Sequence, residues 1–130
     1  MLHVYGIKNC NTVKKGLDWL NDNKIEFDFF DVKKVDLSNN LINNWIKNIS
    51  SPYAAENLIN KTGMTWRKLS EDEKKIPLSK ENIIYLIKKY PTAMKRPLIT
   101  LEGDVLAIGF DESIYEEKFK WVKHLILPKS

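Results

Sequence analysis

The chain has 130 residues, of which 43% are hydrophobic and 29% are charged, and its formal net charge is +4. This composition is typical of a single soluble domain over residues 1–130. No apolar run approaches the roughly 18–20 residues that cross a bilayer, and the N-terminus does not resemble a signal peptide. Lysines interleaved with acids form no basic stripe, so we expect no direct nucleic-acid or membrane partner. The single cysteine permits no internal disulfide, which favours a cytoplasmic location.

The N-terminal part predicts a strand, a helix and a second strand. Apolar residues alternate with polar neighbours over residues 2–5, as in a short strand. A helix follows over about residues 12–21, where one face carries Val13, Leu17 and Leu20. Gly16 in this helix allows a close approach to a sheet. Aromatic residues that alternate with acids predict a strand over residues 25–31, so the two strands should be parallel with a right-handed crossover.

Residues from about 36 to 90 are predicted to be wholly helical. Ser38 caps a helix whose apolar residues share one face, namely Leu41, Ile42, Trp45, Ile46 and Ile49. A shorter helix is expected over residues 53–60, and a capping-box pattern opens a helical turn at Ser70. Ser79 begins a longer helix with three isoleucines expected to be buried, namely Ile83, Ile84 and Ile87.

The C-terminal part predicts a β-hairpin and a last helix. A strand opens at Pro97, a position where a strand tolerates proline, and a tight turn over residues 102–104 leads to a returning strand over residues 105–108. Asp111 caps a helix with four core residues, namely Ile114, Tyr115, Phe119 and Val122. No element is predicted for residues 125–130. The whole pattern is an α/β fold, βαβ–ββα, with a helical insertion.

Cys10 stands between the first strand and the first helix. Backbone N–H groups at a helix start lack intrahelical partners, and together with the helix dipole they favour thiolate over thiol. Lys8 and Lys14 add positive charge, and no acidic residue lies before Leu17. The pattern predicts a reactive, readily ionised thiol, with the alternative that a lone cysteine is a small buried hydrophobe.

Four segments in register resemble the arsenate reductase (ArsC)/Spx-like family, and in particular its YffB branch. They are residues 5–10 (YGIKNC), 65–69 (TWRKL), 95–98 (KRPL) and 109–111 (GFD), and their spacing fits from residue 1 to about 119. The resemblance implies a thioredoxin-like fold with a four-stranded mixed sheet. Its thioredoxin-like part would span about residues 1–35 and 91–122, and its all-helical insertion about residues 36–90.

The resemblance also implies functional residues. Cys10 would be the attacking nucleophile, and Arg67 and Arg96 would hold an oxyanion or a carboxylate of glutathione, which the planar guanidinium fork matches. A proline that opens the third strand is often cis in such frames, so Pro97 would turn Arg96 toward the thiol. Thr12 would donate a hydrogen bond to the thiolate, and the lysines named above, Lys8 and Lys14, complete the candidates for binding substrate or glutathione.

Each candidate has a purely structural alternative. Arg96 would instead form a surface salt bridge, worth about 0–1 kcal/mol. Arg67 would stack on Trp66, Thr12 would be a plain N-cap, and the two lysines would be solvated charges.

The chain departs from the family pattern at positions that matter for the reaction. The arsenate-reducing branch has a histidine where this chain has Gly6, an arginine where it has Lys14, and a third arginine where it has Gly109. Spx regulators typically carry a C-x-x-C switch, but the position three residues after Cys10 is Val13. These departures disfavour arsenate reduction and an internal redox switch.

The sequence therefore predicts a glutathione-dependent thiol oxidoreductase of arsenate-reductase-like type. Its substrate would be a small oxyanion or a mixed disulfide, and glutathione would be the co-substrate that resolves the adduct on Cys10. No metal is expected, because His3 and His124 have no partners at ligand spacing. One alternative is a non-enzymatic Spx-like regulator that docks on RNA polymerase through the helical insertion. The other is a true arsenate reductase.

Overall fold

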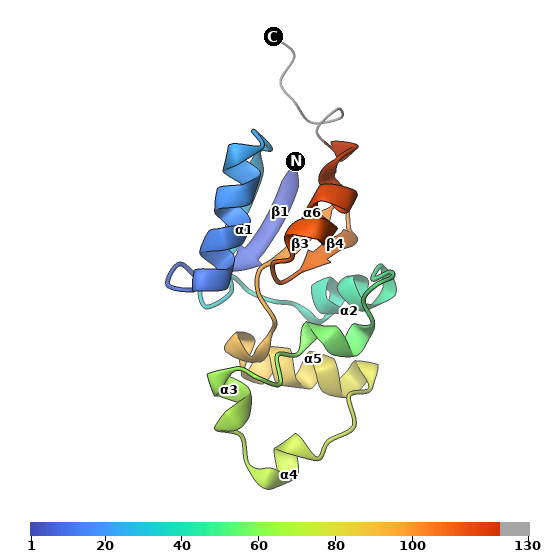
Figure 1. Ribbon diagram of the computed structural model, residues 1–130. Coiled ribbons are helices and arrows are strands. Elements are labelled where there is room, and N and C mark those ends of the chain that lie inside the picture. The colour runs from blue at the N-terminus through green and yellow to red at the C-terminus, as the bar shows by residue number, and fades with distance from the viewer. Residues whose placement is uncertain (123–130) are drawn as a thin grey trace.

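The computed structural model describes residues 1–122, so His124 and residues 125–130 lie outside the described part (Figure 1). The first three elements are β1 (Leu2–Gly6), α1 (Asn11–Asp22) and β2 (Phe27–Asp31). The insertion contains α2 (Asn39–Lys47), the 3₁₀ helix η1 (Ala55–Leu58), α3 (Met64–Arg67), α4 (Glu71–Lys74) and α5 (Lys80–Lys89). A second 3₁₀ helix, η2 (Pro91–Ala93), leads to β3 (Leu98–Leu101), β4 (Asp104–Ile108) and α6 (Glu112–Phe119).

The strands form one four-stranded mixed sheet in the order β2-β1-β3-β4. β1 runs parallel to β2 and antiparallel to β3, and Val4 pairs with both Phe29 and Ile99. The β3–β4 turn has two residues at positive φ, Glu102 at 48° and Gly103 at 90°, which is the mirror-image turn that tight hairpins favour. Asp104 therefore belongs to β4, one residue earlier than predicted. The βαβ–ββα frame itself is confirmed.

Both faces of the sheet are covered. On one face, α1 and α6 enclose a core that includes Val4, Trp19, Ile99, Tyr115 and Phe119. On the other face, residues of the insertion pack against the sheet in a second core, which includes Tyr5, Ile42, Trp45, Leu86, Leu98 and Ile108. Figure 1 shows the insertion as a separate layer that extends away from the sheet. The double cover explains why Tyr5 is buried although strand alternation places it opposite Val4.

The insertion is less helical than predicted. The helix expected over residues 53–60 is only the 3₁₀ turn η1, because the residues on either side of it are extended. Ile49 lies beyond the end of α2 and forms a parallel bridge with Val105, while Ile59 forms an antiparallel bridge with Met94. Both segments use their backbone groups for strand pairing, which takes them out of a helix.

The predicted helix caps are confirmed. The side chains of Ser38, Ser70 and Ser79 each accept a hydrogen bond from the backbone N–H three residues later, at 3.1, 3.1 and 3.3 Å. Asp111 does the same for α6, at 3.1 Å from the N–H of Ile114. Within residues 1–122, no helix has both the length and the apolar character that crossing a bilayer requires.

The layers also pack closely at Gly16 of α1. A Cβ atom placed there would lie 2.9 Å from the Tyr115 hydroxyl and 3.0 Å from Cγ of Pro97. The Tyr115 hydroxyl donates to the carbonyl of Gly109 at 2.6 Å, and the N–H of Gly109 donates to the carbonyl of Pro97 at 2.9 Å. These contacts join α1, α6 and the adjoining ends of β3 and β4.

We predict that Gly16→Ala destabilises the protein. The alanine would gain roughly 0.5–1 kcal/mol of helix propensity, but its methyl group would collide with a rigid proline ring and a hydrogen-bonded hydroxyl, and such overpacking costs about 1–3 kcal/mol. Urea unfolding would measure the difference. Lys15→Ala, at an exposed position of the same helix, is the control. A Gly16→Ala variant as stable as the control would contradict the close contact.

Candidate active site

Cys10 is the N-cap residue of α1. Its backbone is extended, with φ −137° and ψ 119°, and its carbonyl accepts the N–H of Lys14 at 2.9 Å. Its side chain makes no capping hydrogen bond and is partly exposed. The sulfur therefore stands at the start of the helix without being used to cap it. Thr12 is an exposed residue inside α1, so the interpretation of Thr12 as the N-cap is wrong.

Arg96 precedes Pro97, and the peptide bond between them is cis, as expected. Its Nη1 atom donates to the carbonyl of Thr92 at 2.7 Å and to that of Met94 at 3.4 Å. Its Nε atom is buried and has no hydrogen-bond partner among the described residues. The interpretation of Arg96 as a surface salt bridge is wrong, because its partners are backbone carbonyls. Its Nη2 atom makes no hydrogen bond with any described residue.

Arg67 is exposed at the end of α3. Its Nε and Nη2 atoms both donate to the carbonyl of Thr62, at 3.2 and 2.7 Å. The cation over the Trp66 ring is Lys61, whose Nζ atom lies 5.7 Å from the ring centroid. The interpretation of Arg67 as a stacking partner of Trp66 is therefore wrong.

The two arginines are connected through Thr92, which the sequence gave no reason to single out. The hydroxyl groups of Thr65 and Thr92 lie 2.7 Å apart and join α3 to η2. Arg67 lies two residues after Thr65, and Arg96 binds the carbonyl of Thr92. Cys10 is linked to the two arginines only indirectly. It is the N-cap residue of α1, and Gly16 of α1 packs on Pro97, the residue that follows Arg96. No hydrogen bond or ion pair within residues 1–122 joins either guanidinium group to Cys10.

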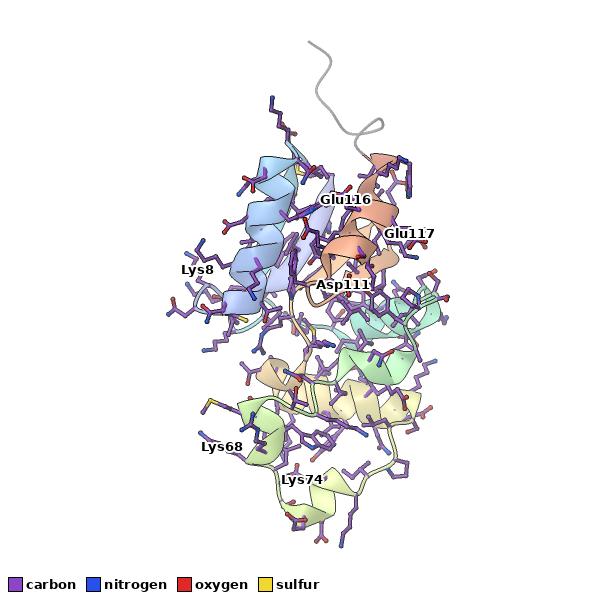
Figure 2. The ribbon with its side chains drawn as sticks, viewed as in Figure 1. Lys8, Lys68, Lys74, Asp111, Glu116 and Glu117 are labelled. Carbon is purple, nitrogen blue, oxygen red and sulfur yellow. The ribbon has the colours of Figure 1, made fainter. Side chains whose placement is uncertain are left out.

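The two candidate lysines differ in their surroundings. Lys14 forms an exposed salt bridge with Asp18 at 2.6 Å, and this hydrogen bond and the carboxylate charge raise the pKa of Lys14 above its ordinary value. Lys8 makes no hydrogen bond or ion pair with any described residue. In Figure 2, Lys8 projects from the loop before α1, away from Asp111, Glu116 and Glu117 on the α6 side. Of these two candidate lysines, Lys8 is therefore the one that no described residue pairs with.

The arsenate-reducing branch carries functional side chains at two positions where this chain has glycine, and other side chains lie close to both glycines. A Cβ atom at Gly6 would lie 2.9 Å from Val13 and 3.3 Å from Phe29. Gly109 has φ +81°, and a Cβ atom there would lie 3.1 Å from Cε of Lys95. A side chain at position 6 would displace Val13 or Phe29, and a residue with a Cβ atom at position 109 would be strained by the positive φ. Within the described residues, no group of three or more His, Cys, Asp or Glu side chains is placed to hold a metal ion.

The fold and the cysteine at the start of α1 define a protein of the thioredoxin-like class with an insertion between its two halves. The sequence model of the ArsC family matches residues 5–118, so the chain belongs to the ArsC family.

Similar proteins agree with this assignment. An uncharacterized protein from Haemophilus influenzae is 40% identical over 121 residues, which is 92% of this chain and 99% of that protein. The solved structure of a YFFB protein has 31% identity and a TM-score of 0.78, covering 91% of this chain and 98% of its own. An arsenate reductase (ArsC) related protein from Brucella melitensis has 35% identity and a TM-score of 0.67, with 92% and 94% covered. The predicted resemblance to the YffB branch is confirmed.

The Thr65–Thr92 contact predicts a coupled effect on stability. Changing either residue alone to valine leaves the other hydroxyl without its partner in a partly buried position, so each single variant should lose about 1 kcal/mol. The double variant Thr65→Val/Thr92→Val should lose less than the sum, because both polar groups are then removed. Urea unfolding of the four proteins gives the coupling energy. Strict additivity would show that the hydroxyl pair does not hold α3 on η2.

Proposed function

We propose that the protein is a glutathione-dependent thiol oxidoreductase with Cys10 as its nucleophile. The observation that carries the proposal is the placement of the single cysteine, uncapped and partly exposed, at the N-terminus of α1 in a chain of the ArsC family. Relatives described as a possible arsenate reductase and as an ArsC-related protein support thiol-reductase-like chemistry. The first backbone N–H groups of α1 and the helix dipole favour the negative charge of a thiolate.

The reaction proceeds in two thiol–disulfide exchanges. The Cys10 thiolate attacks the glutathione sulfur of a mixed disulfide, a bond forms between the two sulfurs, and the electron pair of the broken bond leaves on the substrate sulfur, which takes up a proton. The thiolate of a second glutathione then attacks the same glutathione sulfur. This releases glutathione disulfide and returns Cys10 as thiolate. Glutathione must resolve the adduct because the chain has no second cysteine.

The arginines supply the anion-binding groups. Arg96 is held through Nη1 by the carbonyl of Thr92 and its Nε atom is buried, so its Nη2 atom would bind a carboxylate of glutathione. Arg67 is held in the same way by the carbonyl of Thr62 and is exposed. A guanidinium group whose orientation is fixed before binding loses less side-chain freedom when the ligand arrives. Thr12, exposed in the first turn of α1, and Lys14 are secondary candidates.

Arsenate reduction is the less supported alternative. The packing of Val13 and Phe29 obstructs a side chain at position 6, and the positive φ of Gly109 would strain any residue with a Cβ atom there, so two of the side chains that the arsenate-reducing branch carries fit poorly. The third position is Lys14, whose ammonium group is engaged with Asp18. The exchange steps proposed for a mixed disulfide use no side chain at position 6 or position 109.

The first test is whether Cys10 forms and turns over a glutathione adduct. Incubation with glutathione disulfide should add one glutathione to the wild-type protein by intact mass, and none to Cys10→Ser. Reduced glutathione should then remove it. Wild-type protein should turn over the mixed disulfide of glutathione and 2-mercaptoethanol, and Cys10→Ser should not. A protein that forms no adduct and shows no turnover would refute the proposal and favour the non-enzymatic alternative, for which capture of RNA polymerase is the next assay.

The second test addresses Arg96. Arg96→Lys keeps the charge but removes the planar fork, so the KM for glutathione should rise about tenfold, which corresponds to about 1.4 kcal/mol. The kcat should change less, because the variant leaves Cys10 unaltered. Lys68→Ala, at an exposed position of the insertion, is the control (Figure 2). An unchanged KM in Arg96→Lys would remove Arg96 from the binding site.

A further inference from the structure

An open groove of about 340 Å³ runs between α1 and the edge strand β2. Five residues of α1 line it, namely Val13, Lys14, Leu17, Asp18 and Asn21, together with Lys8 before the helix and Phe29 of β2. No reaction step described so far uses this groove.

The groove lies in line with Cys10. Its five helix residues stand 3, 4, 7, 8 and 11 positions after Cys10, which is the spacing of one helix face. Side chains on a helix lean toward its N-terminus, so this face leads down to the cysteine. Gly16, which packs on Pro97, stands six positions after Cys10 and therefore lies about 120° around the helix. The groove and the arginine side are thus two separate approaches to one sulfur.

The groove combines an apolar floor with one available cation. Leu17 and Phe29 are only partly buried, although their neighbours Val13 and Leu20 are fully buried, so they offer apolar surface to a ligand. Lys14 and Asp18 neutralise each other. Lys8, at the end of the groove next to Cys10 in sequence, pairs with no described residue and projects away from the acids of α6 (Figure 2).

We infer that this groove holds the peptide half of the mixed disulfide substrate, an extended peptide with an apolar side chain and an acidic residue beside its cysteine. The inference rests on the proposed function and names its substrate class. Glutathione would bind on the arginine side. The apolar side chain of the peptide would cover Leu17 and Phe29, and its acidic residue would pair with Lys8. When Cys10 attacks the glutathione sulfur, the peptide sulfur leaves with the electron pair, and the reduced peptide departs from the groove.

An extended peptide suits this place better than a compact ligand. The groove is partly open to solvent and is bordered by β2, whose outer edge pairs with no other strand in residues 1–122. Its volume is at the lower end of the range for ligand sites, which is room for one or two side chains rather than for a folded partner.

The test uses glutathionylated peptides that differ in one residue. Each peptide carries a leucine and a cysteine joined to glutathione, with Glu, Gln or Lys beside the cysteine. The wild-type protein should show a kcat/KM about tenfold higher for the Glu peptide than for the Lys peptide. Lys8→Glu should reverse this order. Lys15→Glu makes the same charge change five positions after Cys10, on another face of α1, and should keep the wild-type order.

The mixed disulfide of glutathione and 2-mercaptoethanol separates the two proposals. Suppose that this small disulfide is turned over, but that the three peptides react at equal rates or that Lys8→Glu leaves their order unchanged. The groove inference would then be overturned, and the proposed function would stand. Absence of turnover with every substrate would overturn the proposed function.

A binding measurement tests the groove without turnover. In Cys10→Ser, titration with the Glu peptide should shift the NMR amide signals of Leu17, Asp18 and Phe29, and Lys8→Glu in the same background should reduce these shifts. Shifts confined to other surfaces, or none at millimolar peptide, would overturn the inference whatever the activity assay shows.

Discussion

The whole arrangement depends on the close contact of Gly16 with Pro97 and Tyr115. α1 carries Cys10 at its start, and Pro97 follows Arg96 directly, so this contact sets the position of the nucleophile's helix relative to the arginine side. It is reinforced by two hydrogen bonds at Gly109, one from Tyr115 and one to Pro97. Because packed interiors tolerate little change in volume, a helix fixed in this way cannot slide without disturbing α6 and the hairpin as well.

The helical insertion gives the second arginine its place. Its own core, around Trp45 and Leu86, packs on the sheet face opposite α1, and the Thr65–Thr92 contact then brings α3 against η2. Both guanidinium groups bind a backbone carbonyl instead of a carboxylate. An acidic partner would have neutralised them, whereas a carbonyl fixes their orientation and leaves the positive charge for a ligand.

Regular elements were predictable because their periodicity and caps are local. Alternation over β1 and β2, the serine caps and the tight hairpin all depend on neighbours a few residues away. Non-local contacts were not predictable. Ile49 and Ile59 were predicted to be helical, but each forms a β-bridge instead. Their partners, Val105 and Met94, are brought near only by the tertiary fold. In α1, Leu17 was expected in the core. Instead Trp19 is buried against Tyr115 and Phe119 of α6, whereas Leu17 lines the groove beside β2 and is partly exposed. Likewise, no pattern reveals that Arg67 binds the carbonyl of Thr62.

The absence of a side chain at position 6 and the presence of the groove between α1 and β2 have a common structural cause. Val13 and Phe29 fill the space that a side chain at position 6 would need, and the same two residues line the groove between α1 and β2. A histidine at position 6 would displace them and deform the groove wall. A chain that has Gly6 can therefore keep an apolar surface beside its cysteine, which suits an organic disulfide better than a small hydrated oxyanion. The departures from the arsenate-reducing pattern and the proposed peptide substrate are, on this view, consequences of the same packing.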